Sequence, residues 1–226
     1  MTRFPARNRV PEFTVFASLL RMTTKYDFSV VREGLVEDLK AAYPTQWGEF
    51  ETAKVLGEDI FGSPRPHPNA VLNLFLEQKI KFALPFAAYR AGLGGPSALA
   101  SETPGLILPR LTLARIIHGM GEIRRLMTHA AHGIAYVGNL SVCPQKPCLL
   151  NFATKPPEQS AEALKTISDV MVQKSEGDML SSLSLGNLLC VNCAKLLKSG
   201  HRDCRKQLVW AKLPSLVGWE SWDAVL

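Results

Sequence analysis

Five cysteines are the residues of this 226-residue sequence whose type and spacing best suit chemistry. Four of them form two close pairs, Cys143-x4-Cys148 and Cys190-x2-Cys193. Zinc takes four soft ligands in a tetrahedron, and pairs with short spacing supply those ligands two at a time. These four residues are therefore a candidate structural zinc site, which would leave no coordination position open for catalysis.

A second ligand set fits the same chemistry, with the spacing C-x2-C-x7-H-x2-C: Cys190, Cys193, His201 and Cys204. On a continuous helix, Cys190 and Cys193 would share a face at positions i and i+3. The alternative is that the cysteines are buried thiols that pack as small apolar side chains. The sequence leaves both interpretations open, so the cofactor is either structural zinc or none.

The sequence shows no constellation that predicts an enzyme. It contains no Gly-x-Ser-x-Gly, P-loop or Gly-x-Gly-x-x-Gly motif. His118, His129 and His132 belong to one predicted helix, where Glu122 is the one nearby carboxylate, so we interpret them as polar-face or capping residues. We therefore expect a protein without catalytic activity.

Composition indicates a folded, globular chain: 46% of the residues are hydrophobic and 20% are charged. The net charge is +6, but the basic residues are scattered, with the densest group at Arg202, Arg205 and Lys206. A nucleic-acid-binding surface gathers such residues in a stripe, so a nucleic-acid partner is not favoured. A zinc-stabilised, nucleic-acid-associated module stays as the alternative function.

Nothing in the sequence predicts a membrane partner, because no apolar run approaches the roughly 20 residues that span a bilayer. The first ten residues carry three arginines and lack the apolar core of a secretory signal. We therefore expect a cytoplasmic and/or nuclear protein in a reducing compartment, where disulfides are not expected.

Apolar periodicity predicts a pair of antiparallel helices near the start. Phe13, Phe16, Ala17 and Leu20 recur at i, i+3, i+4 and i+7, which is one face of a helix. A second stripe follows, ended by Pro44: Val31, Leu35, Leu39 and Tyr43. The short connection between the two stripes predicts that the helices lie side by side.

The remainder of the chain also lacks the alternating pattern of a strand, so we predict an all-α fold. Helices are expected near residues 45–54, 71–75, 84–89, 109–132, 160–174 and 187–212. Proline, glycine and serine predict loops at 92–105, 138–159 and 175–186. The last segment, from Leu213 to Trp219, is an apolar tail that we expect to close the protein's own core.

Four stretches match, in order, a pattern found in fungal BTB/POZ-domain proteins. The first, Phe16-Ala17-Ser18-Leu19-Leu20-Arg21-Met22 with Lys25-Tyr26-Asp27, resembles the family's "LLRLxxKYxV". The second, Val31-Arg32-Glu33-Gly34-Leu35 through Tyr43-Pro44-Thr45 and Trp47, resembles "LRxxALxxLxxxFPTTLxxW". The others resemble "VINLARExxxxxLLPAALYxC" and "LCxxC…WxxLPxxFGLxxW": Asn69-Ala70-Val71-Leu72-Asn73-Leu74, Leu84-Pro85-Phe86-Ala87-Ala88-Tyr89, Leu189-Cys190-Val191-Asn192-Cys193 and Trp210-Ala211-Lys212-Leu213-Pro214. The match covers about residues 12–222. The chain departs from the pattern at Phe86 and lacks the cysteine after Tyr89.

The resemblance implies a three-part chain: a basic lead at 1–11, the closing helix pair of a BTB/POZ fold at 12–56, and an irregular multi-helix C-terminal domain at 57–226. The strand-bearing BTB core would lie before Pro11, where only ten residues stand. The tetrathiolate zinc set also agrees better with the family's ending.

Interaction is the function that the resemblance implies, because BTB domains dimerise or bind other proteins. We expect a scaffold with protein partners, a homo-oligomer among them. Docking on a cullin-type scaffold is not expected without the core. Phe13, Phe16 and Leu20 would normally pack on that core. We therefore expect this face to be covered by the chain itself or by a partner, or else exposed, and we take it as the predicted interaction surface.

Overall fold

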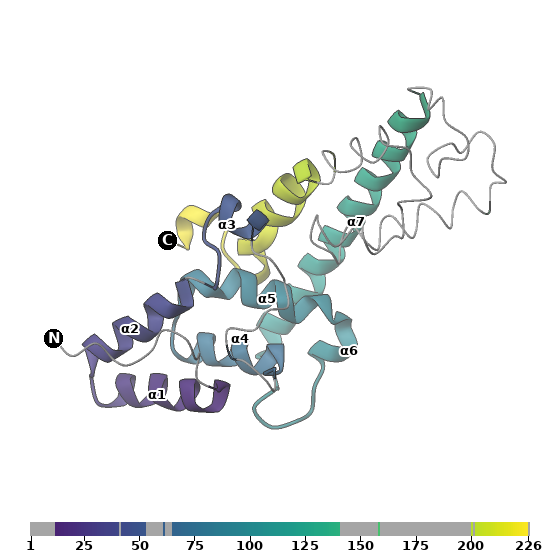
Figure 1. Cartoon of the computed structure of the whole chain (residues 1–226). Helices are drawn as coiled ribbons and strands as arrows, with labels where there is room; N and C mark the ends of the chain where they lie inside the picture. Colours follow the sequence, from purple (N-terminus) through teal and green to yellow (C-terminus); the bar gives the residue numbers. More distant parts are fainter. Residues whose placement is uncertain are drawn as a thin grey trace. The chain divides into compact units, whose positions relative to one another are not determined.

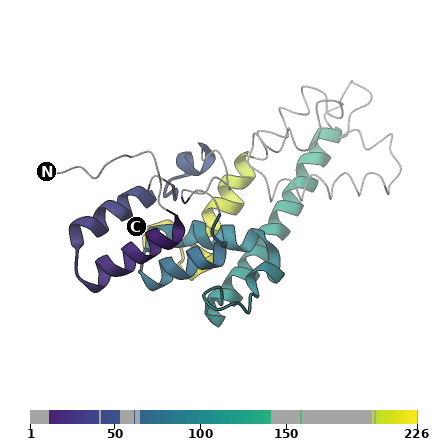
Figure 2. The same ribbon diagram turned by 60° about the horizontal axis from the view of Figure 1, so that its bottom comes forward.

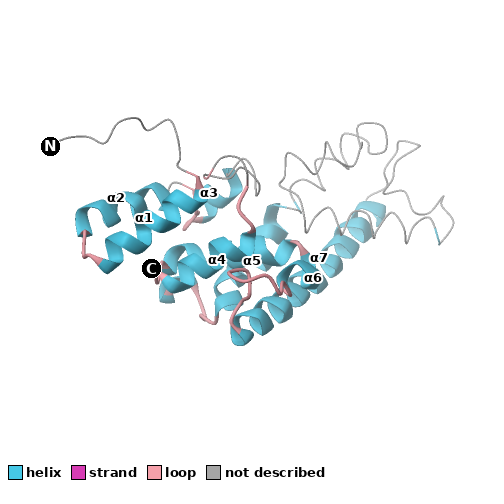
Figure 3. Cartoon of the chain, turned by 90° about the horizontal axis from the view of Figure 1, so that it is seen from below, coloured by secondary structure: helices cyan, strands magenta, loops and turns pink. Residues whose placement is uncertain are grey.

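The computed structural model describes residues 12–40, 42–52, 61, 65–140, 158, 200 and 202–225. All regular structure within these residues is helical (Figure 3). This confirms the predicted all-α fold class; the BTB-specific part of the prediction stays a prediction. The chain divides into two compact units, one made of Met1–Ile117 with Leu213–Leu226 and the other of His118–Lys212.

The first unit begins with the predicted pair of helices, α1 (Phe13–Lys25) and α2 (Ser29–Lys40). They lie side by side and run antiparallel (Figures 1 and 2). The turn between them is tight, because Asp27 adopts the left-handed conformation at φ 54° and the Phe28 amide donates to the Thr23 carbonyl at 2.9 Å. Aspartate tolerates this conformation better than most residues do.

The second predicted stripe is only partly correct. α2 ends at Lys40, before Tyr43, and of its residues only Leu39 is buried, while Val31 is 36% exposed. Tyr43 is nevertheless buried, because the chain after α2 turns its ring edge-on to Phe75 at 4.9 Å between centroids.

Aromatic rings fill the core of this unit. α3 (Trp47–Thr52) contributes Phe50, whose ring meets Phe86 edge-on at 5.9 Å. α4 (Pro68–Glu77) and the short 3-10 helix η1 (Lys81–Ala83) lead into α5 (Leu84–Leu93). Eight of the ten α5 residues are buried, as expected of a helix that is apolar on all sides.

The segment 92–105, expected to be a loop, contains a helix. α5 continues to Leu93 and α6 follows at Gly95–Leu99. Gly95 takes a positive φ of 81°, and Pro96 stands in the first turn, where a proline begins a helix without losing a hydrogen bond. Leu99 is 2% exposed, so packing stabilises this short helix.

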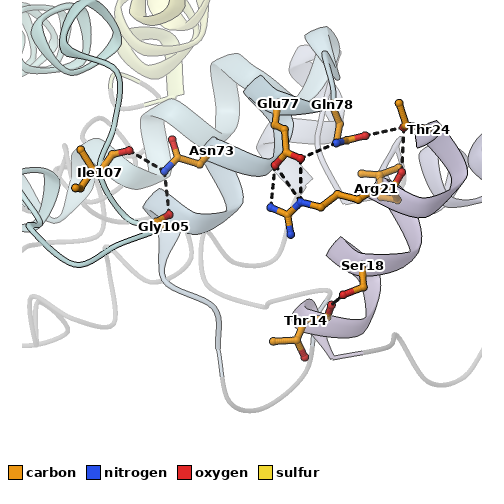
Figure 4. A network of polar contacts seen from close by, with 10 residues as sticks. Thr14, Ser18, Arg21, Thr24, Asn73, Glu77, Gln78, Gly105 and Ile107 are labelled. Atoms are coloured by element: carbon orange, nitrogen blue, oxygen red, sulfur yellow. Dashed lines mark hydrogen bonds and ion pairs between the residues drawn. The ribbon is translucent and has the colours of Figure 1, made fainter.

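Asn69 joins α4 to the segment that follows α6. Its side chain is 1% exposed, and Nδ2 donates to three carbonyl oxygens, at 3.3 Å from Ala98, 3.2 Å from Leu99 and 3.1 Å from Leu106. Asn73, one turn later, donates to Gly105 and Ile107, each at 3.0 Å (Figure 4). The two side-chain amides supply hydrogen bonds to backbone carbonyls that would otherwise have no partner in this irregular segment.

The long helix α7 (Arg110–Leu140) extends beyond the predicted 109–132. Within the second unit, Met120, Ile123 and Met127 are buried, as their spacing predicts. None of the described helices has both the length and the apolar character needed to cross a bilayer.

The C-terminal part continues through a π-helical turn, η4 (Arg205–Val209), and two 3-10 helices, η5 (Trp210–Val217) and η6 (Trp222–Ala224). Leu213 and Leu216 are fully buried and Val225 is 4% exposed. The apolar tail is therefore part of the core, as the sequence predicts. Residues 138–140 of the loop predicted at 138–159 belong to α7 instead, and apart from Glu158 the predicted loops and helices between 141 and 199 lie outside the described residues.

Candidate interaction surface

The predicted surface, Phe13, Phe16 and Leu20, lies on the side of α1 that faces the first unit. Phe16 is 2% exposed and Leu20 is completely buried, whereas Phe13 is half-buried. The rings of Phe13 and Phe16 each lie 5.2 Å from the ring of Phe61. The chain itself therefore covers this face, which was one of the three outcomes left open by the sequence.

Two polar contacts fix α1 against α4 (Figure 4). Arg21 donates from Nε and Nη2 to the carboxylate of Glu77, with Nη2 2.8 Å from Oε2. One turn later, the Thr24 hydroxyl donates to Oε1 of Gln78 at 2.6 Å. The hydrogen bonds from Arg21 lower the pKa of Glu77, so this carboxylate is charged at neutral pH.

The second helix of the pair is held less firmly. Leu39 near its end is buried, and near its start the Arg32 Nη2 donates to the Gln78 carbonyl at 3.1 Å. Leu35 and Val36 are half-buried. α2 therefore packs on the unit along one narrow line.

A second apolar stripe runs along α1, away from the buried one. Val15, Leu19, Met22 and Tyr26 follow each other at spacings of four, three and four residues, which places them on one side of the helix. They are 49%, 40%, 51% and 54% exposed. α1 and the turn after it thus carry apolar side chains in two directions, one covered by the chain and one open.

Further exposed apolar side chains lie in the turn and at the start of α2. Phe28 is 56% exposed and its ring lies 6.2 Å from that of Tyr26. Val30 is 80% exposed and Val31 36%. We call these seven side chains the outer face of the hairpin: Val15, Leu19, Met22, Tyr26, Phe28, Val30 and Val31. Three further exposed apolar side chains, Ile107, Leu111 and Ile117, belong to another part of the unit.

The outer face is suited to binding, since exposed apolar side chains gathered on one hairpin are typical of a site of interaction. The Lys25 ammonium lies 5.3 Å from the centre of the Tyr26 ring, which adds a charged rim. In the described part of the chain, a small hollow is lined by Tyr43, Pro66, Pro68, Val71, Ala87 and Arg90. It has room for about one water molecule and is too small for a substrate.

The predicted zinc ligands are not placed. Cys143, Cys148, Cys190, Cys193 and His201 lie outside the described residues. Cys204 alone is described: it is a half-buried thiol whose pKa is raised by burial and by the negative charge of Asp203. Zinc binding thus stays a prediction.

The predicted histidine roles can be checked at two positions. His118 and His129 are both exposed. The carboxylate of Glu122, the one acidic residue of α7, is held by Arg125 at 3.0 Å. This agrees with polar-face histidines.

The outer face was missed at the sequence level, although a signal for it exists. The spacing of Val15, Leu19, Met22 and Tyr26 is as regular as that of the buried stripe. A helix that packs on the protein through one side only is expected to show one apolar stripe, so a second stripe indicates a second contact surface.

Comparisons with known proteins found no match to this chain among family models, curated proteins or solved structures.

Proposed function

We propose that this chain is a non-enzymatic protein–protein interaction module, a scaffold that binds its partner through the outer face of the α1–α2 hairpin. One observation carries the proposal: seven large apolar side chains, each at least 36% exposed, share one hairpin. When a partner covers such a surface, the free energy gained is about 25 cal/mol for each Å² of apolar area removed from water.

The support beneath the outer face favours binding as well. α1 is fixed by the Arg21–Glu77 ion pair and by the buried side chains of Phe16 and Leu20. A rigid helix loses little conformational freedom when a partner docks, so more of the binding energy remains. Tyr26 and Phe28 are the aromatic anchors that such interfaces commonly use.

The resemblance to fungal BTB/POZ proteins supports the same function, because interaction is what that family does. A BTB/POZ-like chain can also bind through surfaces outside the BTB core, and the outer face would be such a surface. The alternative of a zinc-stabilised, nucleic-acid-associated module depends on ligands that lie outside the described residues, apart from Cys204, and no described geometry favours it.

The proposal is tested by placing a charge in the outer face. Leu19→Lys and Met22→Lys should abolish association with other proteins, measured by quantitative mass spectrometry of what is isolated with the tagged chain. They should also strongly weaken any self-association of the purified chain. Leu111→Lys is the matched control, since Leu111 is likewise an exposed leucine on a helix, at 62%.

Circular dichroism melts establish that all three variants remain folded. Lysine at a surface position changes the free energy of unfolding by only about 0.5 kcal/mol. The proposal is overturned if Leu19→Lys and Met22→Lys keep the same associated proteins and the same mass in solution as the wild type.

A further inference from the structure

We propose that the partner covering the outer face is a second copy of this chain, bound in a two-fold symmetric dimer. This inference rests on the proposed function and names the partner. A two-fold interface uses the same surface on both chains, so that surface must complement itself. The outer face meets this requirement in charge, in shape and in area.

The two helices of the hairpin carry opposite charges. α1 contains Arg21 and Lys25 and no acidic residue. Arg21 is paired with Glu77, whereas Lys25 has no ion-pair partner among the described residues. The outer face therefore has a basic rim on the α1 side.

The α2 side has an acidic rim. Glu33, Glu37 and Asp38 follow one another along this helix, and Lys40 holds Glu37 at 3.1 Å. Within the described part of the chain, Glu33 and Asp38 have no ion-pair partner. Glu33 lies three residues after the exposed Val30 and thus borders the same apolar surface.

A two-fold axis that runs along the hairpin, between its helices, brings these rims together. The rotation places α1 of one chain over α2 of the other and leaves the two turns at the same end. Lys25, at the end of α1, then faces Glu33 of the second copy, and the contact occurs twice. At these two positions the arrangement brings no like charges together.

The shape of the outer face suits a helix as its cover. The spacing of four, three and four residues from Val15 to Tyr26 is the pattern of a helix that packs against another at about 20°. On α2, a side chain added at Gly34 would meet nothing within 4 Å, so a helix of the second copy can approach closely there.

The area is compatible with a stable dimer. The exposed halves of Tyr26 and Phe28 alone amount to on the order of 200 Å², given about 150–250 Å² for a whole aromatic side chain. Five more apolar side chains and two charged rims bring the surface towards the roughly 800 Å² that each partner buries in an interface of standard size. α2, which packs along one line in the monomer, gains most from this cover.

The test measures the mass of the purified full-length chain by sedimentation over a range of concentrations. We expect a dimer, weakened roughly a hundredfold by Leu19→Lys. Lys25→Glu and Glu33→Lys should each weaken it roughly tenfold, because each variant puts like charges together twice. A mixture of these two variants should form a mixed dimer of wild-type affinity, since every contact is then attractive.

Matched controls are Lys81→Glu and Glu102→Lys, two exposed positions outside the hairpin, whose mixture should behave as the wild type does. If the mixture of Lys25→Glu and Glu33→Lys recovers the wild-type dimer affinity while the control variants change nothing, a second copy is supported as the partner. A monomer at all concentrations, or a dimer insensitive to Leu19→Lys, overturns it. If such a monomer still loses other proteins on Leu19→Lys, the proposed function stands and only the identity of its partner was wrong.

Discussion

The guanidinium of Arg21 on α1 holds the carboxylate of Glu77 on α4 with two nitrogens, at 2.9 Å from Nε to Oε1 and 2.8 Å from Nη2 to Oε2. The two residues are 56 positions apart in sequence, so the contact orients the hairpin on the rest of the first unit. Both side chains remain about half exposed. An ion pair in such a place fixes geometry more than it stabilises the fold.

We predict that Glu77→Gln lowers the free energy of unfolding by about 0.5 kcal/mol at pH 7, measured by urea denaturation. Arg21 lowers the pKa of Glu77 in the folded chain. A carboxylate with a lowered pKa stabilises the fold above its unfolded pKa, and the contribution is lost as the pH falls through the folded value. The difference between wild type and variant should therefore disappear in acid, below the ordinary glutamate pKa of about 4.3.

The Arg21 guanidinium does not add to this pH dependence, because its pKa is raised above an already high value. Glu49, whose carboxylate accepts from the Thr45 amide at 2.8 Å and does not join α1 to α4, serves as a control site. If the difference in the free energy of unfolding between wild type and Glu77→Gln stays constant down to pH 3, the ion pair is absent in solution.

Leu19 and Leu20 are neighbours of the same type on α1, and they should respond to truncation very differently. Leu20 is completely buried, so Leu20→Ala should cost about 2–5 kcal/mol of stability through lost apolar contact and a cavity. Leu19 is 40% exposed, and Leu19→Ala should cost less than about 1 kcal/mol. Chemical denaturation of both variants measures the difference, and equal losses would mean that the open side of α1 is covered in the monomer.

This pair also shows how far the sequence can lead. Periodicity predicted α1 and its buried face, because Phe16, Ala17 and Leu20 fall at helical spacing. The same criterion applies equally to Leu19 and Met22, and spacing alone does not say which stripe a distant residue will cover. Phe61 decides it by packing on Phe13 and Phe16, and Phe61 belongs to none of the stripes that the sequence analysis identified.

The errors elsewhere have different causes. α6 was expected as a loop because glycine and proline usually interrupt helices, but Gly95 and Pro96 stand at its first residues, where they do not. Tyr43 was assigned to α2 because it continues the stripe, whereas the chain has already left the helix when the ring reaches the core. The first error concerns the position of glycine and proline within a helix, whereas the place of Tyr43 depends on tertiary contacts rather than on local preference.

Asn69 should be among the most sensitive polar residues of the chain. Asn69→Ala removes one donor group from three carbonyl oxygens in a buried site and should cost about 1–3 kcal/mol. Asn69→Asp should cost more at neutral pH, because it sets a carboxylate against those oxygens, and should recover partly in acid, where the protonated group can donate. Urea denaturation at two pH values measures both effects.

Asn73→Ala is the comparison for this prediction. Asn73 donates to two carbonyls in the same segment, but both bonds are exposed, so water can replace them. We expect a loss of less than about 1 kcal/mol. A larger loss at Asn73 than at Asn69 would contradict the buried arrangement.

Gly218 allows close contact between the C-terminal tail and the start of α7. Its φ is +92°, and a Cβ atom there would lie 2.6 Å from Cζ of Arg115, whose Nη1 is 3.5 Å from the Val217 carbonyl oxygen. Gly218→Ala should therefore combine backbone strain of about 1 kcal/mol with a smaller cost for moving the flexible, exposed Arg115 guanidinium aside. Gly105→Ala has a similar φ of +81° and open space, so it isolates the backbone cost of about 1 kcal/mol.

The double variant Arg115→Ala with Gly218→Ala separates the two effects further. Removing the guanidinium should return the cost of Gly218→Ala to that of Gly105→Ala, measured by thermal melts on a common background of Arg115→Ala. If the costs of the two single changes simply add, Arg115 does not contact Gly218 in solution.

Cys204 should react slowly with thiol reagents at neutral pH. Burial and the adjacent Asp203 raise its pKa, so less of the reactive thiolate is present than in a free cysteine with a pKa of about 8.5. Asp203→Asn should lower that pKa and speed alkylation of Cys204 by iodoacetamide, followed by peptide mass spectrometry from pH 7 to pH 10. A thiolate bound to zinc would behave differently: it would be protected from the reagent at every pH until a chelator is added. If a chelator releases the protection, Cys204 belongs to the ligand set that contains His201. If the alkylation rate simply rises with pH, Cys204 is the half-buried thiol that the structure describes.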